Sequence, residues 1–316
     1  MNSATKEILW DTVRNFPRFI FHLLWFSKNS PLDANLHQLW NSVLSLPETE
    51  RLNYSSEIEF VRNLPLDRIH EIIFPYSARS PLPDQEKRIV SGRLTGMPYV
   101  EHKGKKLFFP RDFTEEKARE TYSGLVDVEG LTGEGKKEKS PHCYQTADFR
   151  VEEGDVLLDI GSAEALFALD NIERVKEAYV FECVSRWRKP LLATFQSYVG
   201  KTRIIPKIVS GHTGRGMITL QDAIKDKEGN KDQYFVKMDI EGGERDVIRG
   251  NVDFLCRNKI KLSCCVYHRQ DDAEVIERML TNIGFSISFS DGFMLPSMNG
   301  IHYPYFRHGV IYAKNY

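Results

Sequence analysis

The spacing of hydrophobic positions divides the chain into three regions. Over residues 1–80 apolar side chains recur every three or four positions, a pattern that predicts a helical N-terminal region. Residues 81–150 begin within the linker-like Ser-Pro-Leu-Pro-Asp segment at 80–84 and combine helical and strand patterns. From Val151 onward short apolar runs alternate regularly with helical stretches, which predicts a separate domain over residues 151–316.

The mixed region carries three local signals. Residues Met97–Pro110 have the pattern of a hairpin that turns near Lys103 and Gly104. Residues 113–122 have a helical pattern. The glycine-rich and charged stretch over 130–140 predicts a mobile loop.

The C-terminal region has the pattern of a parallel sheet covered by helices. Short apolar strands that alternate with helices are typical of a doubly wound fold, in which both faces of the sheet are buried. The predicted strands are Val156–Ile160, Ala178–Glu182, Arg203–Val209, Tyr234–Asp239, Lys261–Tyr267, Phe285–Phe289 and Val310–Ala313. The predicted helices include Trp187–Val199, Arg245–Asn251 and Asp272–Ile283. The fold class is therefore α/β, a doubly wound, mostly parallel Rossmann-like sheet preceded by a helical N-terminal region.

Composition and charge narrow the expected partners. The chain of 316 residues is 41% hydrophobic and 28% charged, which is ordinary for a globular protein. Its formal net charge of −1 leaves no basic excess for a nucleic acid, so no nucleic-acid partner is expected. The five cysteines include no C-x-x-C pair, which argues against a zinc site or a disulfide framework and favours a cytoplasmic location.

The N-terminal region is where association with other molecules is expected. Its apolar run over Phe19–Phe26 is far shorter than the roughly 20 residues that a transmembrane helix needs, so no transmembrane segment is predicted. The run is more typical of a helix buried against the protein or a second copy, and an interfacial membrane helix is the alternative. Residues 1–80 are therefore candidates for a homodimer contact or for peripheral membrane association.

Two acids follow the first two strands of the C-terminal region. Asp159 ends the first strand just before a tight turn at Gly161, and Glu182 ends the second. In an open α/β sheet, ligands bind beyond the carboxyl ends of the strands, near the point where the strand order reverses. A glycine there lets the backbone approach a ligand, and an acid at the second strand end can accept the ribose hydroxyls of an adenosine.

The glycine content of the first turn discriminates between NAD and S-adenosylmethionine as the cofactor. A pyrophosphate needs several close backbone N–H groups, usually from a G-x-G-x-x-G segment, but here only Gly161 is present, followed by Ala163 and Glu164. A carboxylate also repels a pyrophosphate, whereas the cationic sulfonium of S-adenosylmethionine tolerates acidic neighbours. The turn therefore disfavours NAD and favours S-adenosylmethionine.

Three acids within six residues form the most specific signal. The predicted strand Tyr234–Asp239 delivers Asp239 and Glu241 to the ligand edge of the sheet, and a glycine pair and Glu244 follow. Glu244 lies in the first turn of a predicted helix, where an acid stabilises the helix dipole, so it is assigned a structural role. Asp239 and Glu241 are assigned to the site.

His268 follows the next predicted strand at the same edge. An imidazole, with an ordinary pKa of about 6.5, suits a general base that takes a proton from a hydroxyl. The segment Ser140–Tyr144, just before the domain, is a candidate to fold over the cofactor. Asp239, Glu241 and His268 also have donor types that suit Mg²⁺ or Mn²⁺, but their spacing along the chain is not diagnostic, and no metal is assigned.

These segments together resemble FkbM-type methyltransferases. The resemblance spans roughly residues 153–313 and rests on Asp159-Ile160-Gly161, Phe181-Glu182, Thr219-Leu220-Gln221-Asp222 and the acidic segment Val236–Glu244. It implies a class I, S-adenosylmethionine-dependent fold and O-methylation of a sugar, glycan or polyketide hydroxyl. The family usually has a glycine where this chain has Ala165, a departure that bears on cofactor affinity.

The predicted function is an S-adenosylmethionine-dependent O-methyltransferase with a small-molecule or glycan acceptor. The predicted catalytic residues are Asp239, Glu241 and His268. The predicted cofactor contacts are Asp159, Gly161, Ser162, Glu182, Ser210 and Asp239. Two alternatives stay open. The first is an NAD-dependent sugar oxidoreductase or epimerase, although neither Tyr144 nor Tyr267 has the lysine four residues later that such enzymes commonly use. The second is a non-catalytic cofactor- or glycan-binding protein, which the departure at Ala165 favours.

Overall fold

A computed structural model describes residues 41–62, 89–129, 140–225, 232–294 and 303–316 of the chain. The helices expected before residue 41, the apolar run Phe19–Phe26, the linker at 80–84 and the loop over 130–139 lie outside the described residues. Within the described residues, no helix combines the length and the apolar character that crossing a membrane requires.

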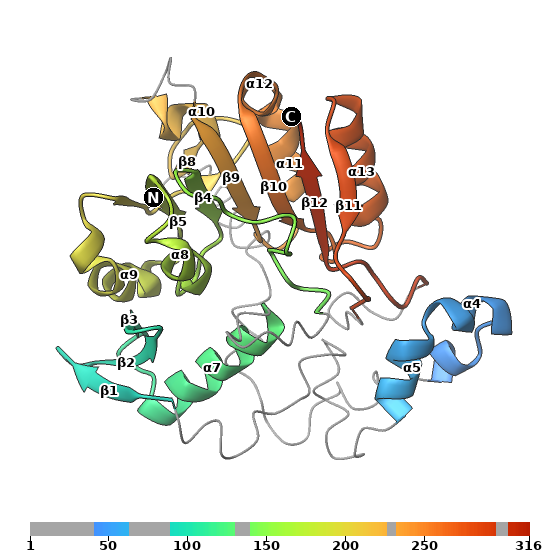
Figure 1. The fold of residues 1–316 in the computed structure, drawn as a ribbon, viewed down its shortest axis with the longest axis horizontal. Coiled ribbons are helices and arrows are strands. Elements are labelled where there is room, and N and C mark those ends of the chain that lie inside the picture. Colours follow the sequence, from blue (N-terminus) through green and yellow to red (C-terminus); the bar gives the residue numbers. More distant parts are fainter. Residues whose placement is uncertain (1–40, 63–88, 130–139, 226–231, 295–302) are drawn as a thin grey trace, which may run out of the picture.

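A seven-stranded sheet forms the centre of the protein (Figure 1). Its strand order is β11-β12-β10-β9-β4-β5-β6. The strands are β4 (Val156–Ile160), β5 (Glu177–Phe181), β6 (Thr202–Ile205), β9 (Gln233–Met238), β10 (Lys259–Cys265), β11 (Ser286–Phe289) and β12 (Val310–Lys314). Of these seven, β12 runs antiparallel to both of its neighbours and the other pairings are parallel. The predicted doubly wound, mostly parallel sheet is confirmed.

One predicted strand was wrong in its extent. The run Arg203–Val209 is divided into β6 and a short β7 (Ile208–Val209), which pairs with β8 (Met217–Ile218) in a separate two-stranded sheet. Pro206 lies at the break. Proline has no N–H to donate to a ladder, so a continuous strand across it is unfavourable. The polypeptide therefore leaves the large sheet there.

Helices cover both faces of the sheet, because strand side chains alternate between the two. Leu157 and Val180 face the core that includes α8 (Leu166–Asn171) and α9 (Arg188–Thr194). Leu158 and Tyr179 face the opposite core, against four other helices. These are α10 (Leu220–Ala223), α11 (Glu244–Gly250), α12 (Val252–Arg257) and α13 (Asp272–Asn282). The single helix predicted over Trp187–Val199 is instead α9 flanked by 3-10 turns at Ser185–Trp187 and Gln196–Tyr198.

A small antiparallel sheet precedes the large one. It comprises β1 (Ser91–Leu94), β2 (Met97–His102) and β3 (Lys105–Phe108), and α7 (Glu115–Val128) follows it. The predicted β2–β3 hairpin is confirmed, with its turn at Lys103 and Gly104, whose φ values are +50° and +78°. Strand β1 was not predicted, and α7 extends beyond the expected Tyr122.

The small sheet and the large sheet share one hydrophobic core. Val100, Leu107 and Phe109 pack in the same buried cluster as the residues of α8 and α9. An ion-pair cluster joins the same parts: Asp170 Oδ1, in α8, lies 2.7 Å from His102 Nε2 and 2.6 Å from Lys103 Nζ. Two further helices, α4 (Glu48–Asn53) and α5 (Ser55–Arg62), lie at the lower right of Figure 1.

The strand order reverses at β4. From β4 the chain passes through α8 to β5 on one side, and later returns to β9 on the other side. The carboxyl ends of β4 and β9 flank this switch point, where open α/β sheets bind their ligands.

Candidate active site

The carboxyl end of β9 is held tightly against that of β4. The N–H of Asp239 donates to the carbonyl oxygen of Ile160 at 3.1 Å. Gly161, which follows, has a φ of +74°, and a Cβ at this position would lie 1.9 Å from the carbonyl oxygen of Asp239. The glycine is therefore required by the approach of the two strand ends, a different reason from the ligand contact expected from the sequence.

A sharp backbone turn follows β9. Glu241 has a φ of +60° and Gly242 a φ of +100°, before α11 begins at Glu244. The left-handed region is costly for a residue with a Cβ, and such strained residues concentrate at functional sites. The turn leaves the carboxylate of Glu241 close to the imidazole of His268.

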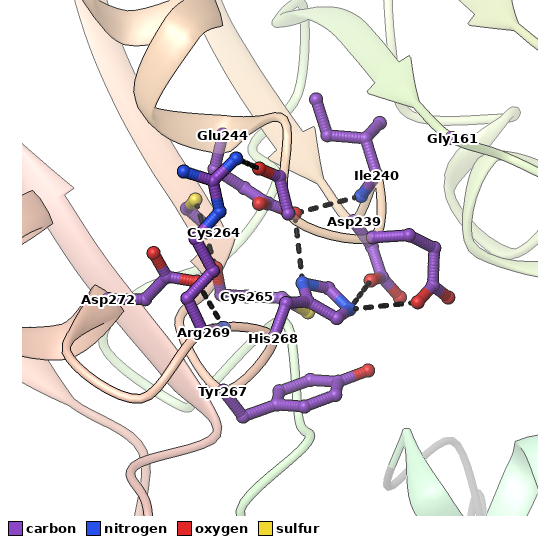
Figure 2. A network of polar contacts seen from close by, with 12 residues as sticks. Gly161, Asp239, Ile240, Glu244, Cys264, Cys265, Tyr267, His268, Arg269 and Asp272 are labelled. Carbon is purple, nitrogen blue, oxygen red and sulfur yellow. Dashed lines mark hydrogen bonds and ion pairs between the residues drawn. The ribbon is translucent and has the colours of Figure 1, made fainter. Parts of the chain in front are cut away.

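His268 lies among three carboxylates (Figure 2). Its Nε2 is 3.3 Å from Asp239 Oδ1 and 3.5 Å from Glu241 Oε2, and its Nδ1 is 3.0 Å from Glu244 Oε1. The same Glu244 oxygen accepts the N–H of Ile240 at 3.0 Å. The structure thus brings the three predicted catalytic residues, Asp239, Glu241 and His268, together.

Glu244 has more than the helix-dipole role expected from the sequence. Its side chain is fully buried and contacts His268 directly. Burial of an acid in the first turn of a helix cannot be recognised from a single sequence, because an exposed acid at that position has the same pattern.

Burial and ion pairing shift the pKa values of the cluster in different directions. Burial raises the pKa of Glu241 to about 7. Burial opposes ionisation of Asp239 as well, but hydrogen bonds with His142 and His268 hold the pKa of Asp239 well below its usual value. For His268, burial is outweighed by the bonds to Asp239 and Glu244, which raise its pKa. A carboxyl group that titrates near neutral pH therefore lies beside an ionised one.

The segment Ser140–Tyr144 reaches the same carboxylate. The hydroxyl of Tyr144 donates to Asp239 Oδ2 at 2.7 Å, and Nε2 of His142 is 3.5 Å from that oxygen. His142 Nε2 also lies 3.3 Å from the hydroxyl of Tyr267. His142 and Tyr144 were not among the predicted site residues, although their segment was noted as a candidate to cover the site.

Asp159 is withdrawn from the crevice. It has 0% exposure, and Nζ of Lys237 lies 3.3 Å from its Oδ1 while donating to the carbonyl oxygen of Gly161 at 2.7 Å. Burial raises the pKa of Asp159, and Lys237 opposes this shift. Lys237 was missed because a lysine within an apolar strand gives no sequence signal of its partner. The buried ion pair of Asp159 and Lys237 thus links the carboxyl ends of β4 and β9.

Glu182 lies at the end of β5 with its carboxylate fixed by two backbone donors. Ala163 N–H donates to Oε2 at 2.8 Å and Val184 N–H donates to Oε1 at 2.7 Å. Ser162 is buried in the intervening turn, where its N–H donates to Phe181 O at 3.1 Å. The predicted contacts Gly161, Ser162 and Glu182 thus lie together around one turn.

The structure does not bring Ser210 to this turn. Its carbonyl oxygen accepts from Asn251 at 3.0 Å, and its hydroxyl donates to His212 O at 2.9 Å. Ser210 therefore lies beside the C-terminal end of α11, whereas Glu244 lies at its start.

The residue where glycine was expected has a backbone that favours glycine. Ala165 precedes α8 with φ +62°, and Ala163 has φ +46°. A glycine adopts this region without the cost, about 1–2 kcal/mol, that a Cβ adds. Alanine in place of glycine at position 165 therefore affects the cost of the backbone conformation. It does not change a ligand-facing surface, because the side chain of Ala165 is buried.

The sheet topology is that of a Rossmann-like α/β fold, with an acidic cluster beside its switch point. Residues 191–287 match the family model described as the methyltransferase FkbM domain, so the predicted resemblance to FkbM-type methyltransferases is confirmed over this segment. The match contains Asp239, Glu241, Glu244 and His268, and begins after Asp159 and Glu182.

Solved structures with similar folds have low identity to this chain. The methyltransferase FkbM from Methylobacillus flagellatus KT is 14% identical, with a TM-score of 0.42 over 65% of this chain. The precorrin-6y C5,15-methyltransferase from Geobacter metallireducens GS-15 is 13% identical, with a TM-score of 0.35 over 53% of this chain and 85% of its own. SMU.1697c, a putative methyltransferase from Streptococcus mutans in complex with SAH, is 11% identical, with a TM-score of 0.34 over 52% of this chain and 90% of its own.

The chain spans 56% of the length of the Methylobacillus protein. No curated protein matches the sequence.

Proposed function

We propose that the protein transfers a methyl group from S-adenosylmethionine to a hydroxyl of a sugar or glycan. The observation that supports this most strongly is the cluster of Asp239, Glu241 and His268 at the carboxyl edge of the sheet, beside the switch point. Methyl transfer to oxygen needs an aligned acceptor and a route for its proton. The cluster offers hydrogen-bond acceptors for alignment and, in Glu241, a group that can take a proton near neutral pH, whereas the raised pKa of His268 disfavours its predicted role as the base.

The surroundings of the first turn fit a cationic nucleoside better than a dinucleotide. Glu129 and Glu164 are both buried, and Oε2 of Glu129 accepts no hydrogen bond from the described residues. Burial raises the pKa of Glu129, and the nearby Glu164 and Asp239 raise it further, so these carboxyl groups lie close enough to interact. A sulfonium or an ammonium bound next to them would stabilise their ionised forms, whereas a pyrophosphate would not.

The chain's own residues divide the work at the site. When bound, S-adenosylmethionine supplies an electrophilic methyl group. Glu182, held by two backbone N–H groups, presents its carboxylate for ribose hydroxyls. Asp239 stays ionised and accepts from the acceptor hydroxyl, while Glu241, with a pKa of about 7, can take up a proton near neutral pH. Glu244 orients His268 through Nδ1.

The test measures binding and transfer separately. Calorimetry with S-adenosylmethionine, S-adenosylhomocysteine and NAD should show binding of the first two, and a labelled-methyl screen against glycan fragments should show transfer. Transfer is expected to fall at least about 100-fold in Asp239→Asn and to be unchanged in Glu274→Gln, an exposed acid on α13. Binding of NAD alone would contradict the proposal, and cofactor binding without any transfer would favour the non-catalytic alternative.

The role of the N-terminal region is also a proposal. Association of residues 1–80 with a second copy or with a membrane surface, and a cytoplasmic location, stay predictions from the sequence.

A further inference from the structure

We infer that Asp239, Glu241 and His268 bind one divalent metal ion of the Mn²⁺ type. The inference rests on the proposed function only for the role of the ion, which is to hold the acceptor hydroxyl. The site itself is defined by three side chains from two neighbouring strand ends, β9 and β10.

The spacing of the three donor atoms is that of ligands around an ion. Nε2 of His268 is 3.3 Å from Asp239 Oδ1 and 3.5 Å from Glu241 Oε2, and all three donor atoms lie within 4.8 Å of one another. A charge-assisted N–H···O hydrogen bond is shorter, about 2.7–2.9 Å. Neighbouring ligands in an octahedral site with bonds of about 2.1–2.2 Å lie about 3.0–3.1 Å apart. The observed separations are nearer to the second geometry than to the first.

The imidazole is oriented as metal-bound imidazoles are. Glu244 Oε1 accepts the N–H of Ile240 and lies 3.0 Å from Nδ1 of His268. A carboxylate oxygen at this position requires the proton on Nδ1, so Nε2 points toward Asp239 and Glu241 (Figure 2). A histidine ligand usually donates its other ring N–H to such a carboxylate, which fixes its tautomer.

The charges of the cluster call for a cation. Three carboxylates surround the imidazole of His268, and within the described part of the chain the ion-pair partners of Asp239 and Glu241 are only His142 and His268, with no lysine or arginine among them. The nearby Lys237 pairs with Asp159, and Arg269 donates to the carbonyl oxygen of Gly242. A divalent ion bound between Asp239 and Glu241 would neutralise both.

The donor set indicates the kind of ion and its effect on the acceptor. Mg²⁺ is usually bound by oxygen atoms alone, and structural zinc sites are usually rich in thiolates. Two carboxylates and one imidazole therefore suit Mn²⁺ better than either of those ions. An ion with three protein ligands keeps open positions for the acceptor, and two neighbouring hydroxyls of a sugar fit two of them. Coordination lowers the pKa of a hydroxyl, so its proton leaves to water while Glu241 and His268 act as ligands.

The experiment titrates Mn²⁺ into the full-length, chelator-treated protein and measures free Mn²⁺ by electron paramagnetic resonance. One site per chain is expected, with Mg²⁺ and Zn²⁺ tested as competitors. Glu241→Gln and His268→Gln should weaken Mn²⁺ binding more than about 10-fold, and Glu244→Gln, which removes only the orienting carboxylate, by about 10–100-fold. The matched control Asp253→Asn removes an exposed acid on α12 and should leave binding unchanged. Circular dichroism verifies that each variant is folded.

Failure of the inference and failure of the proposed function are separable. Absence of a stoichiometric Mn²⁺ site in the wild-type protein overturns the inference, whatever the variants do. Methyl transfer that persists in excess chelator also overturns it and leaves the proposed function intact, with Glu241 as the proton acceptor. A Mn²⁺ site in a protein that binds no S-adenosylmethionine would instead overturn the proposed function.

Discussion

The hydroxyl of Tyr144 lies 2.7 Å from Oδ2 of Asp239, a contact that joins residues 95 positions apart in the chain. It ties the segment before the large sheet to the carboxylate at the centre of the candidate site. His142 approaches the same oxygen, at 3.5 Å. The segment Ser140–Tyr144 is thus a part of the site and not a plain linker.

Replacing Tyr144 tests whether this contact serves the chemistry. In Tyr144→Phe, Asp239 loses one hydrogen-bond donor, and we expect kcat/KM for methyl transfer to fall about 10-fold while cofactor affinity is unchanged. The matched control is Tyr198→Phe, which removes a tyrosine hydroxyl that donates to Glu173 at 2.6 Å on the surface and should leave the kinetics unchanged. Equal kinetics in both variants would show that the Tyr144 bond is only structural.

Gly161 should be one of the least replaceable residues of the fold. In Gly161→Ala the new Cβ would lie 1.9 Å from a backbone oxygen and would also be strained at φ +74°, so we expect a loss of at least about 3 kcal/mol in the free energy of unfolding. Gly154→Ala is the control, because Gly154 has φ +84° but nothing lies within 4 Å of the added Cβ. It should lose only about 1–2 kcal/mol. Urea unfolding measures both, and similar losses would contradict the packing argument.

The buried pair of Lys237 and Asp159 should show strong coupling. Lys237→Met leaves Asp159 as a buried carboxylate without its cation, at a cost of about 3–5 kcal/mol. In the double variant Lys237→Met with Asp159→Asn no charge is left unpaired, so the loss should be clearly smaller than the sum of the single losses. A double-mutant cycle by denaturant unfolding measures this, and additive losses would mean that the two residues act independently.

Asp170 should make stability depend on acid pH. Burial would raise its pKa, but bonds from His102 and Lys103 outweigh this and lower the pKa from 3.8 to about 2. Because the folded-state pKa is the lower one, the stabilisation is present above about pH 4 and is lost as the pH falls toward 2. At pH 7 it should amount to about 2 kcal/mol.

Asp170→Asn removes this contribution. The difference in free energy of unfolding between the wild-type protein and Asp170→Asn should therefore shrink between about pH 4 and pH 2. The exposed Asp253→Asn is the control, for which little difference is expected at any pH. A gap that stays constant with pH would contradict the assignment.

Much of the large sheet could be predicted because its strands are short apolar runs with clear ends. Val156–Ile160 agrees with β4, and the expected end at Glu182 differs from β5 by one residue. The exceptions have local causes. The predicted strand across Pro206 fails because proline breaks the ladder, and β1 was missed because Ser91–Leu94 is short and largely exposed.

The candidate site was predictable only in part. Asp239, Glu241 and His268 follow strand ends, so the parallel topology alone places them at one edge. The partners of these residues come from elsewhere in the chain or from positions with ordinary patterns. Tyr144 is 95 residues from Asp239, and Glu244 has the pattern of an exposed first-turn acid.

By itself the sequence determined the order of strands and helices and the edge at which the acidic residues gather, because hydrophobic spacing and strand ends are local properties. Only the tertiary structure decided which charges meet and which are buried. It placed Asp159 beneath the surface with Lys237, left Glu241 partly exposed beside His268, and set their pKa values through burial and pairing. Distance and desolvation depend on the packing of the whole chain, and no local pattern contains them.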